Sequence, residues 1–297
     1  FLLIRGHWSL TSPKGEGKDT ASYLLARAQD DLDKFHEELE YLSGRYVILV
    51  GLSGKTYLYN DTLGARTVYY SVENRIVASH LRILQDLDDY ENFEVEKGLK
   101  VVQWAADFTP AKGIFNLLPN FFLELPSFEV SRFYPRRENP FLAADRDEKY
   151  AEIERIWHCS QRSYFEDNPD VAFSITGGID SRLVLAMAKP YWHKLTGYTY
   201  GEPSHGKKRG AGGTFYRRTM LSDDRIVRVL LESVQFKDHI FIDVTNRAAV
   251  GKDLLGLLEK NSYGSHGQHL VASYQEIFRT GKWLNIRGNA IELARMA

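Results

Sequence analysis

The sequence is poor in cysteine and contains no long apolar run, and both absences narrow what the chain can be. Cys159 is the single cysteine among 297 residues, so no intrachain disulfide can form and a reducing, cytoplasmic setting is the simpler expectation. No apolar run approaches the roughly 18 residues that a membrane-spanning helix needs, so we expect no membrane partner. The formal net charge of −1 argues against nucleic acid as a partner, because phosphate backbones bind strongly basic surfaces.

Length and composition predict two globular domains. Hydrophobic residues make up 43% of the chain and charged residues 26%, which is ordinary for a folded protein. The proline-rich, charged segment 135–140 predicts a linker, and so domains 1–140 and 141–297. Hairpin-like strand pairs in the first half predict an antiparallel sheet. Strands that alternate with helices in the second half predict a doubly wound parallel sheet.

The apolar periodicity gives the expected elements. In the first half we expect strands at 1–10, 45–51, 55–59, 68–71 and 75–79, one long helix at 23–42 and a short helix at 81–87. In the second half we expect strands at 171–175, 195–200, 239–244 and 282–286, and helices at 145–165, 182–189, 224–233, 254–260 and 268–279. Ser222 and Asp223 are expected to cap the helix at 224–233.

The segment from Val171 to Lys189 carries the strongest functional signal. It predicts a buried strand, a tight turn at residues 176–181 and then a helix. Such a turn presents backbone N–H groups at a helix N-terminus, where the helix dipole favours an anion, and its two glycines allow positive φ and close approach of a phosphate. A carboxylate at Asp180 beside a phosphate makes sense when Mg²⁺ bridges the two. The alternative is a Gly-Gly turn that binds nothing.

This turn resembles the S-G-G-x-D-S pyrophosphate loop of the N-type ATP pyrophosphatases, with Thr176 in place of the first serine. Its continuation into Ser181, Arg182 and Leu183 is similar to the asparagine-synthetase-like branch. The resemblance implies ATP and Mg²⁺ as cofactors and Asp180 as the metal ligand, while Arg182 either faces phosphate or is an ordinary surface arginine. The implied ATP and pyrophosphate contacts are Thr176, Gly177, Gly178, Ile179, Asp180, Ser181 and Arg182.

Three later segments extend the resemblance. The strand with Tyr198, Thr199 and Tyr200 is implied to contact adenine through its backbone. The polar segment 201–218 is either a solvated surface loop or a lid whose cations close over triphosphate or a carboxylate. Residues 287–293 resemble a shortened S-G-E-G-x-D-E-L loop, in which Glu292 is the implied catalytic residue and Ile291 stands where the family has Asp. The alternative for this last segment is a strand-to-helix turn with a solvated Glu292.

The first half resembles the class II glutamine amidotransferase domain that precedes the synthetase domain in asparagine synthetases. The similar segments, in the family's order, are 42–46, 60–70, 78–81, 112–120 and 132–134. The resemblance implies an antiparallel αββα sandwich followed by a Rossmann-like ATP pyrophosphatase domain. The family's nucleophile is an N-terminal cysteine, which Phe1 cannot replace. We therefore expect either an earlier start to the full chain or, as we favour, a degenerate scaffold, and we also expect the full chain to continue past Ala297.

The resemblance implies an ATP-dependent ligase that forms an amide bond, as in asparagine biosynthesis. It would adenylate a carboxylate of a small molecule or peptide, release pyrophosphate and transfer an amine from a donor, and it is compatible with a homodimer. Two alternatives stay open. One is an ATP pyrophosphatase that modifies tRNA or another large partner, and the other is a non-catalytic scaffold or binding protein with a decayed synthetase fold.

Overall fold

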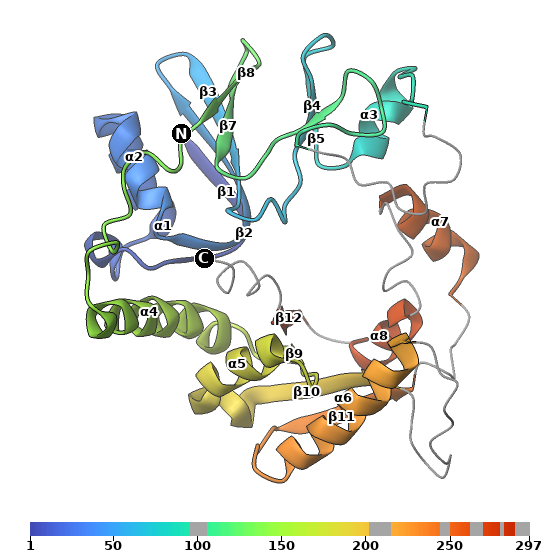
Figure 1. The fold of residues 1–297 in the computed structure, drawn as a ribbon. Coiled ribbons are helices and arrows are strands. Elements are labelled where there is room, and N and C mark those ends of the chain that lie inside the picture. Colours follow the sequence, from blue (N-terminus) through green and yellow to red (C-terminus); the bar gives the residue numbers. More distant parts are fainter. Residues whose placement is uncertain (95–105, 202–214, 244–249, 262–269, 280–281, 289–297) are drawn as a thin grey trace. The chain divides into compact units, whose positions relative to one another are not determined.

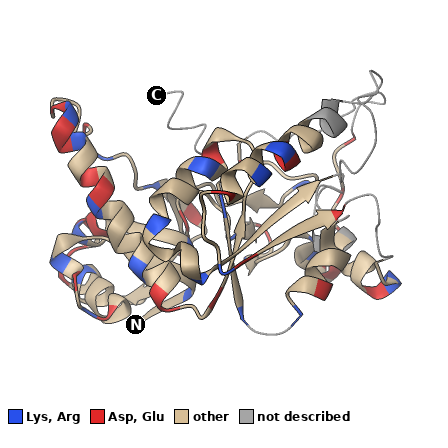
Figure 2. Cartoon of the chain, turned by 90° about the horizontal axis from the view of Figure 1, so that it is seen from below, with Lys and Arg blue, Asp and Glu red and all other residues tan. Residues whose placement is uncertain are grey.

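The computed structural model describes residues 1–94, 106–201, 215–243, 250–261, 270–279 and 282–288 (Figure 1). The chain divides into two compact units, Phe1–Ser160 and Gln161–Ala297. Antiparallel sheets build the first unit and a four-stranded parallel sheet builds the second, so the expected mixed α/β class is confirmed. Within the described part, no helix is both long and apolar enough to cross a bilayer. Basic and acidic residues are interspersed along the helices (Figure 2).

The division of the chain falls later than the sequence predicts. The proline-rich segment suggests a boundary after Pro140, whereas the first unit runs to Ser160. The reason lies in helix α4 (Arg146–Gln161), which bonds to the first unit. Nη1 of Arg155 donates to the carbonyl of Thr11 at 2.6 Å, and the hydroxyl of Ser160 lies 3.3 Å from that of Ser43. Most of the helix expected at the start of the second domain therefore belongs to the first unit.

The first unit contains two antiparallel sheets. The larger sheet has the strand order β1-β2-β3-β7-β8, and the smaller has the order β5-β4-β6. The strands are β1 (Leu2–Leu10), β2 (Leu42–Leu52), β3 (Lys55–Asn60), β4 (Tyr69–Ser71), β5 (Ile76–Ala78), β6 (Phe115–Asn116), β7 (Phe121–Leu125) and β8 (Glu129–Arg132).

Alternating side chains of β2 divide the first unit into two cores, because successive residues of a strand face opposite sides of the sheet. Ile48 and Val50 pack with helices α1 (Thr20–Asp30) and α2 (Leu32–Leu39). Val47 and Leu49 pack in a second core that includes residues of the smaller sheet. Helix α3 (Leu81–Leu87) completes a third cluster with the smaller sheet. The layers of the first unit are thus helices, sheet, sheet and helix.

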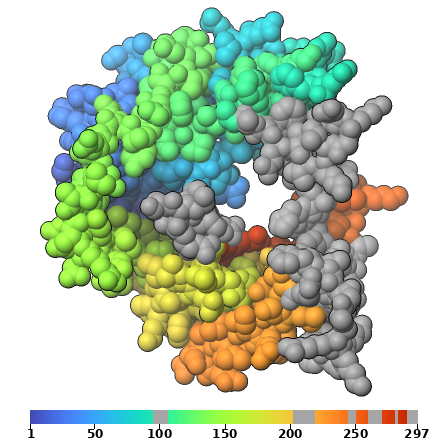
Figure 3. Space-filling model, in the orientation of Figure 1, coloured from blue at the N-terminus to red at the C-terminus, as the bar shows by residue number. Residues whose placement is uncertain are grey.

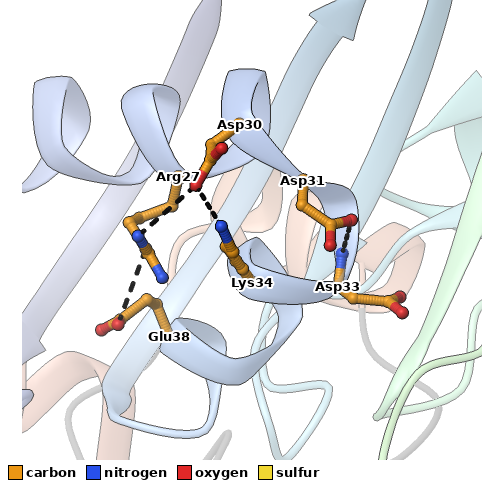
Figure 4. A network of polar contacts seen from close by, with 6 residues as sticks. All are labelled: Arg27, Asp30, Asp31, Asp33, Lys34 and Glu38. Atoms are coloured by element: carbon orange, nitrogen blue, oxygen red, sulfur yellow. Dashed lines mark hydrogen bonds and ion pairs between the residues drawn. The ribbon is translucent and has the colours of Figure 1, made fainter.

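The single long helix expected at 23–42 is wrong, because Asp31 divides it into α1 and α2. Asp31 has extended backbone angles, φ −161° and ψ 134°, and its carboxylate accepts the N–H of Asp33 at the start of α2. Local bonding of this kind competes with helix continuation. Ion pairs then join the two helices, Lys34 to Asp30 at 2.6 Å and Arg27 to Glu38 at 3.9 Å (Figure 4).

In the second unit, the first strand in the chain lies inside the sheet. The strand order is β11-β10-β9-β12 and all the neighbours are parallel. The chain therefore moves from β9 to one side for two strands and returns to the other side for β12. The strands are β9 (Asp170–Ser174), β10 (Leu195–Gly201), β11 (Asp238–Asp243) and β12 (Trp283–Arg287).

Helices cover both faces of the parallel sheet. On one face, Phe173 contacts Phe236 and the loop after β9 packs against α6. Helix α6 also packs against β10, and the yellow part of the chain lies beside the orange part in Figure 3. On the other face, Tyr198 contacts Tyr274 and Phe278. The helices of the second unit are α5 (Ile179–Met187), α6 (Phe215–Leu231), α7 (Lys252–Asn261) and α8 (Val271–Ile277), with short helical turns η2 (Arg162–Glu166) and η3 (Lys189–Lys194). The short turn η1 (Pro13–Gly15) belongs to the first unit.

Three expected helix boundaries in the second half are wrong. The helix after β9 begins at Ile179, three residues before the expected Arg182. The helix expected at 145–165 ends at Gln161 and continues as a wider π-helical turn through Glu166. Helix α6 begins at Phe215, so Asp223 lies inside it and does not cap it.

Candidate functional site

The loop between β9 and α5 lies where the strand order of the parallel sheet reverses. β9 and β12 are neighbours, and their last residues, Ser174 and Arg287, are paired in register. The connection after β9 leads to β10 on its other side. In sheets of this type, ligands bind outside the carboxyl ends of the strands at such a reversal. The segment 176–181 therefore lies at the edge of the sheet where folds of this type bind ligands.

Two hydroxyl groups hold the shape of this loop. The N–H of Thr176 donates to Oγ of Ser181 at 3.1 Å, and the N–H of Gly178 donates to Oγ1 of Thr176 at 3.1 Å. The hydroxyl of Ser181 also lies 3.1 Å from the carbonyl of Thr176. The hydroxyls of Thr176 and Ser181 are therefore part of the turn's own hydrogen bonding.

Asp223 fixes the middle of the loop from helix α6. Its Oδ1 accepts the N–H of Gly177 at 2.9 Å, across 46 residues of sequence. Burial raises the pKa of Asp223, while the bond from Gly177 acts in the opposite direction. The sequence pattern predicts a helix cap at this residue and does not reveal its contact with the loop. The signal in the sequence is the Ser-Asp pair at 222–223, which the apolar pattern alone interprets as a helix cap.

The two glycines of the loop serve packing and not unusual backbone angles. Gly178 has φ −68° and ψ 152°, and neither glycine has positive φ, so that expectation is wrong. A Cβ atom on Gly177 would lie 2.7 Å from Cδ1 of Ile226 and 2.9 Å from Oδ1 of Asp223. At Gly178 the nearest atom would be Oγ1 of Thr176 at 3.2 Å. Gly177 is therefore the more demanding of the two positions.

The N-terminus of α5 has the character of an anion site. Gly178 occupies the N-cap position without a side-chain cap, and Gly178 and Ile179 are exposed. The first N–H groups of a helix have no acceptor within the helix, and the dipole adds positive charge there. Asp180 lies in this first turn, and its Oδ1 is shielded from solvent. Arg182 is exposed, and its Nε donates back to the carbonyl of Gly178 at 3.3 Å.

The chain leaving β12 touches the first turn of α5. A Cβ atom on Gly288 would lie 2.6 Å from the carbonyl carbon of Asp180 and 2.6 Å from N and Cα of Ser181. The two loops that the sequence singles out are thus in backbone contact at Gly288. Ile291 and the expected catalytic Glu292 lie outside the described residues, as do residues 202–214 of the expected lid.

The strand expected to contact adenine forms part of the core. The side chains of Tyr198 and Thr199 are fully buried, and Tyr200 is partly buried. The last pair between β10 and β9 joins Tyr198 to Ser174, so Tyr200 lies beyond that pairing at the carboxyl edge. Any adenine contact would therefore come from the backbone near Tyr200, and this part of the expectation stays a prediction.

A buried polar chain supports the base of the loop. The hydroxyl of Thr199 donates to the carbonyl of Ile175 at 2.8 Å, which leaves its oxygen to accept from Nε2 of His239 at 3.1 Å. Burial lowers the pKa of His239 to about 4, so the imidazole is neutral near pH 7. Ile175 immediately precedes Thr176, so this chain fixes the point at which the loop begins.

In the first unit, one turn that the sequence singles out follows Asn60. Asp61 is fully buried, and its carboxylate accepts the N–H groups of Leu63, Ala65 and Arg66 at 3.1, 3.0 and 2.7 Å. Its role is structural. Cys159 lies in α4 as a free, partly exposed thiol, and its carbonyl accepts a hydrogen bond from Ser9.

In the described ranges, no three His, Cys, Asp or Glu side chains come together as a preformed metal site. Asp180 is one carboxylate beside an anion-favouring helix end. That arrangement suits Mg²⁺, which proteins usually hold through one or two carboxylates together with substrate phosphates.

No protein-family model matches this chain, and no curated protein matches it.

Proposed function

We propose that the protein is an ATP-dependent amide-forming synthetase of the asparagine-synthetase type, which adenylates a substrate carboxylate and transfers an amine to it. One observation carries the proposal. The turn at 176–181 lies at the strand-order reversal, begins a helix without a side-chain cap, and is contacted by the backbone of Gly288 from the neighbouring strand. These are the features that a strand–loop–helix phosphate site requires.

The proposed binding role of the loop follows from its hydrogen bonds. Thr176 and Ser181 hold the turn, and Asp223 holds the amide of Gly177. The terminal phosphates of ATP then bind the amides at the start of α5, those of Ile179 and Asp180. Asp180 would hold a Mg²⁺ ion together with phosphate oxygens, and the ion would neutralise charge that develops on the leaving pyrophosphate.

The reaction has two balanced steps. An oxygen of the substrate carboxylate bonds to the α-phosphorus of ATP, and the bond from that phosphorus to the bridging oxygen breaks, which releases pyrophosphate. The nitrogen of an amine donor then bonds to the acyl carbon, AMP leaves, and the nitrogen gives up a proton. The residues of the loop contribute by positioning and charge stabilisation, and Glu292 is the proposed group that orients the amine or holds the acyl adenylate.

The first unit fits the role of a degenerate amidotransferase-like domain in a cytoplasmic enzyme. Its helix–sheet–sheet–helix layers support this role, because the resemblance implies an αββα sandwich. In the proposed enzyme this unit is a scaffold, and a separate donor or the substrate itself supplies the amine. The carboxylate belongs to a small molecule or a peptide.

A non-catalytic scaffold or binding protein is the second candidate, and one observation favours it. The amides of Thr176, Gly177 and Gly178 are already bonded to acceptors of the protein, Ser181, Asp223 and Thr176. A loop closed in this way has fewer amides to offer to a phosphate. The catalytic proposal therefore requires that the amides in the first turn of α5 bind phosphate without the amides of residues 176–178. The scaffold candidate has no such requirement.

Pyrophosphate release separates the candidates. The full chain is incubated with Mg·ATP and a mixture of amino acids, which supplies both carboxylates and amines, and pyrophosphate and AMP are measured. The proposal expects carboxylate-dependent release of both products, and loss of that release in Asp180→Ala. Formation of ADP and phosphate would contradict adenylation.

A further inference from the structure

Arg287 is a cation at the candidate site that the sequence motifs do not assign. It is the last residue of β12 and is paired in register with Ser174, the last residue of β9. The residue after it, Gly288, is in backbone contact with Ser181 in the first turn of α5. Arg287 therefore lies one residue from the contact between the two loops, on the β12 side of the strand-order reversal.

The guanidinium of Arg287 is held in place from helix α8. Its Nη2 donates to the hydroxyl of Tyr274 at 2.9 Å, and its Cζ lies 5.8 Å from the centre of the Tyr274 ring. Burial raises the pKa of Tyr274, so this hydroxyl keeps its proton. Arg287 as a residue is nevertheless exposed. The guanidinium also interacts with the hydroxyl of Tyr198 on β10. An arginine that is held by tyrosine hydroxyls and still reaches solvent loses less side-chain freedom when it binds an anion.

The other arginine near the loop does not have this arrangement. Arg182 is exposed on α5, and its Nε donates to the carbonyl of Gly178. The turn at 176–181 itself contains no lysine or arginine. The first turn of α5 thus offers amides and a dipole to an anion, and Arg287 offers a full positive charge from the next strand.

We propose that Arg287 binds an oxygen of the α-phosphoryl group of ATP, while the first turn of α5 binds the two terminal phosphates. The assignment rests on the proposed function. In this assignment the two terminal phosphates occupy the N-terminus of α5. The α-phosphate then lies outside the loop, and on the β12 side it is next to Arg287. Guanidinium groups pair well with phosphate oxygens. Because the α-phosphorus is the atom at which adenylation occurs, this contact would also stabilise the charge that develops there.

Calorimetric titration of the full chain tests the assignment, with AMP and inorganic pyrophosphate as separate probes in the presence of Mg²⁺. AMP carries the α-phosphate alone, and pyrophosphate represents the two terminal phosphates. We expect Arg287→Gln to weaken AMP binding at least tenfold and to leave pyrophosphate binding within twofold of the wild type. Arg287→Lys should retain part of the AMP affinity. Arg162→Gln is the matched control and should change neither, because Arg162 is an exposed arginine of η2 that pairs with Glu166 before β9 begins.

Unchanged pyrophosphate binding also shows that Arg287→Gln is folded, so a loss confined to AMP supports the assignment. Unchanged AMP binding overturns it, and so does an equal loss for both probes, which would make Arg287 a structural residue or a contact of the terminal phosphates. If the wild-type protein binds neither probe, the proposed function itself fails. That failure is visible before any variant is measured.

Discussion

A Cβ atom on Gly288 would lie 2.6 Å from Cα of Ser181. Real Cβ atoms do not approach a backbone so closely, so the chain after β12 reaches the first turn of α5 because residue 288 is glycine. Two segments more than a hundred residues apart in sequence thus share one backbone contact, at the carboxyl ends of neighbouring strands. This contact places Gly288, at the end of β12, directly against the turn at 176–181.

Replacing Gly288 by alanine should separate the two loops. The added methyl group meets backbone atoms, which cannot rotate away, so we expect a loss of about 1–3 kcal/mol in the free energy of unfolding. Affinity for Mg·ATP should fall with it, because the first turn of α5 moves. Denaturant unfolding and calorimetry measure the two effects.

The matched control is Gly256→Ala, since a Cβ atom at that position in α7 meets nothing within 4 Å. It should raise stability slightly, because alanine favours a helix over glycine by about 0.5–1 kcal/mol. If Gly288→Ala is as stable as the wild type, the two loops are not in the contact described.

Asp223→Ala should loosen the loop, and Asp223→Asn should not. Alanine removes the acceptor of the Gly177 amide and leaves a partly buried N–H group without its partner, which costs about 1–3 kcal/mol. Asparagine keeps an oxygen at the same position. Thermal unfolding of the two variants distinguishes them, and equal melting temperatures for Ala and Asn would contradict a role for the acceptor.

Asp61→Ala should destabilise the first unit. The carboxylate accepts three backbone N–H groups and is fully buried, so its removal leaves several donors unpaired. We expect a loss of about 3 kcal/mol. Asp86→Ala is the control, because it removes only an exposed ion pair with Arg82, and such pairs contribute about 0–1 kcal/mol. Similar losses for the two variants would show that the Asp61 turn does not stabilise the unit.

Acid should weaken the first unit through His36. Nδ1 of His36 lies 2.9 Å from Nη1 of Arg136, which can only donate, and Nε2 lies 2.9 Å from the hydroxyl of Tyr59. The imidazole is therefore neutral, and burial together with the charge of Arg136 lowers its pKa to about 4.

The sign of the effect follows from proton uptake. In the unfolded chain the histidine titrates near its ordinary pKa of about 6.5. Between that value and about 4, the unfolded state binds a proton that the folded state does not. The contribution of neutral His36 to the free energy of unfolding is therefore fully present above pH 6.5. It falls by about 3 kcal/mol as the pH is lowered toward 4.

Denaturant unfolding at pH 7 and pH 5 checks this, with His36→Phe as the variant. Phenylalanine does not titrate, so the difference in stability between the two pH values should shrink, whatever the stability at pH 7. His239, whose pKa burial also lowers to about 4, and the carboxylates account for what remains. An undiminished pH dependence in His36→Phe would contradict the assignment.

Much of the fold follows from local patterns in the sequence. Short-range apolar alternation and Gly-rich turns are enough to find β1, β2, β3, α3 and the strands of the parallel sheet. The break at Asp31 and the start of α6 at Phe215 are less accessible. At Asp31 the apolar periodicity of a helix continues, although the side chain of this residue ends α1. At the start of α6 the sequence is polar, and its pattern does not indicate the helix that forms.

The candidate site was predictable only in part. The turn at 176–181 carries its own signature, so its place after a buried strand and before a helix could be read directly. Asp223 contacts the turn from α6, and Gly288 contacts it from the end of β12. Hydrophobic periodicity predicts local elements and not contacts between residues so far apart in the sequence. The motif suggests that Gly177 is needed for its backbone angles. In the structure it is needed because a Cβ atom would meet Ile226 of α6, and the motif carries no information on that contact.

Calorimetric titration of the full chain with Mg·ATP tests the central claim most directly, because it needs no knowledge of the carboxylate or the amine. The control variant is Asp253→Ala, which removes an exposed acidic residue from the first turn of another helix of the same unit, α7. The account predicts saturable one-to-one binding by the wild type and by Asp253→Ala, and affinity at least tenfold weaker in Asp180→Ala. No binding by the wild type, or equal binding by all three proteins, would contradict it.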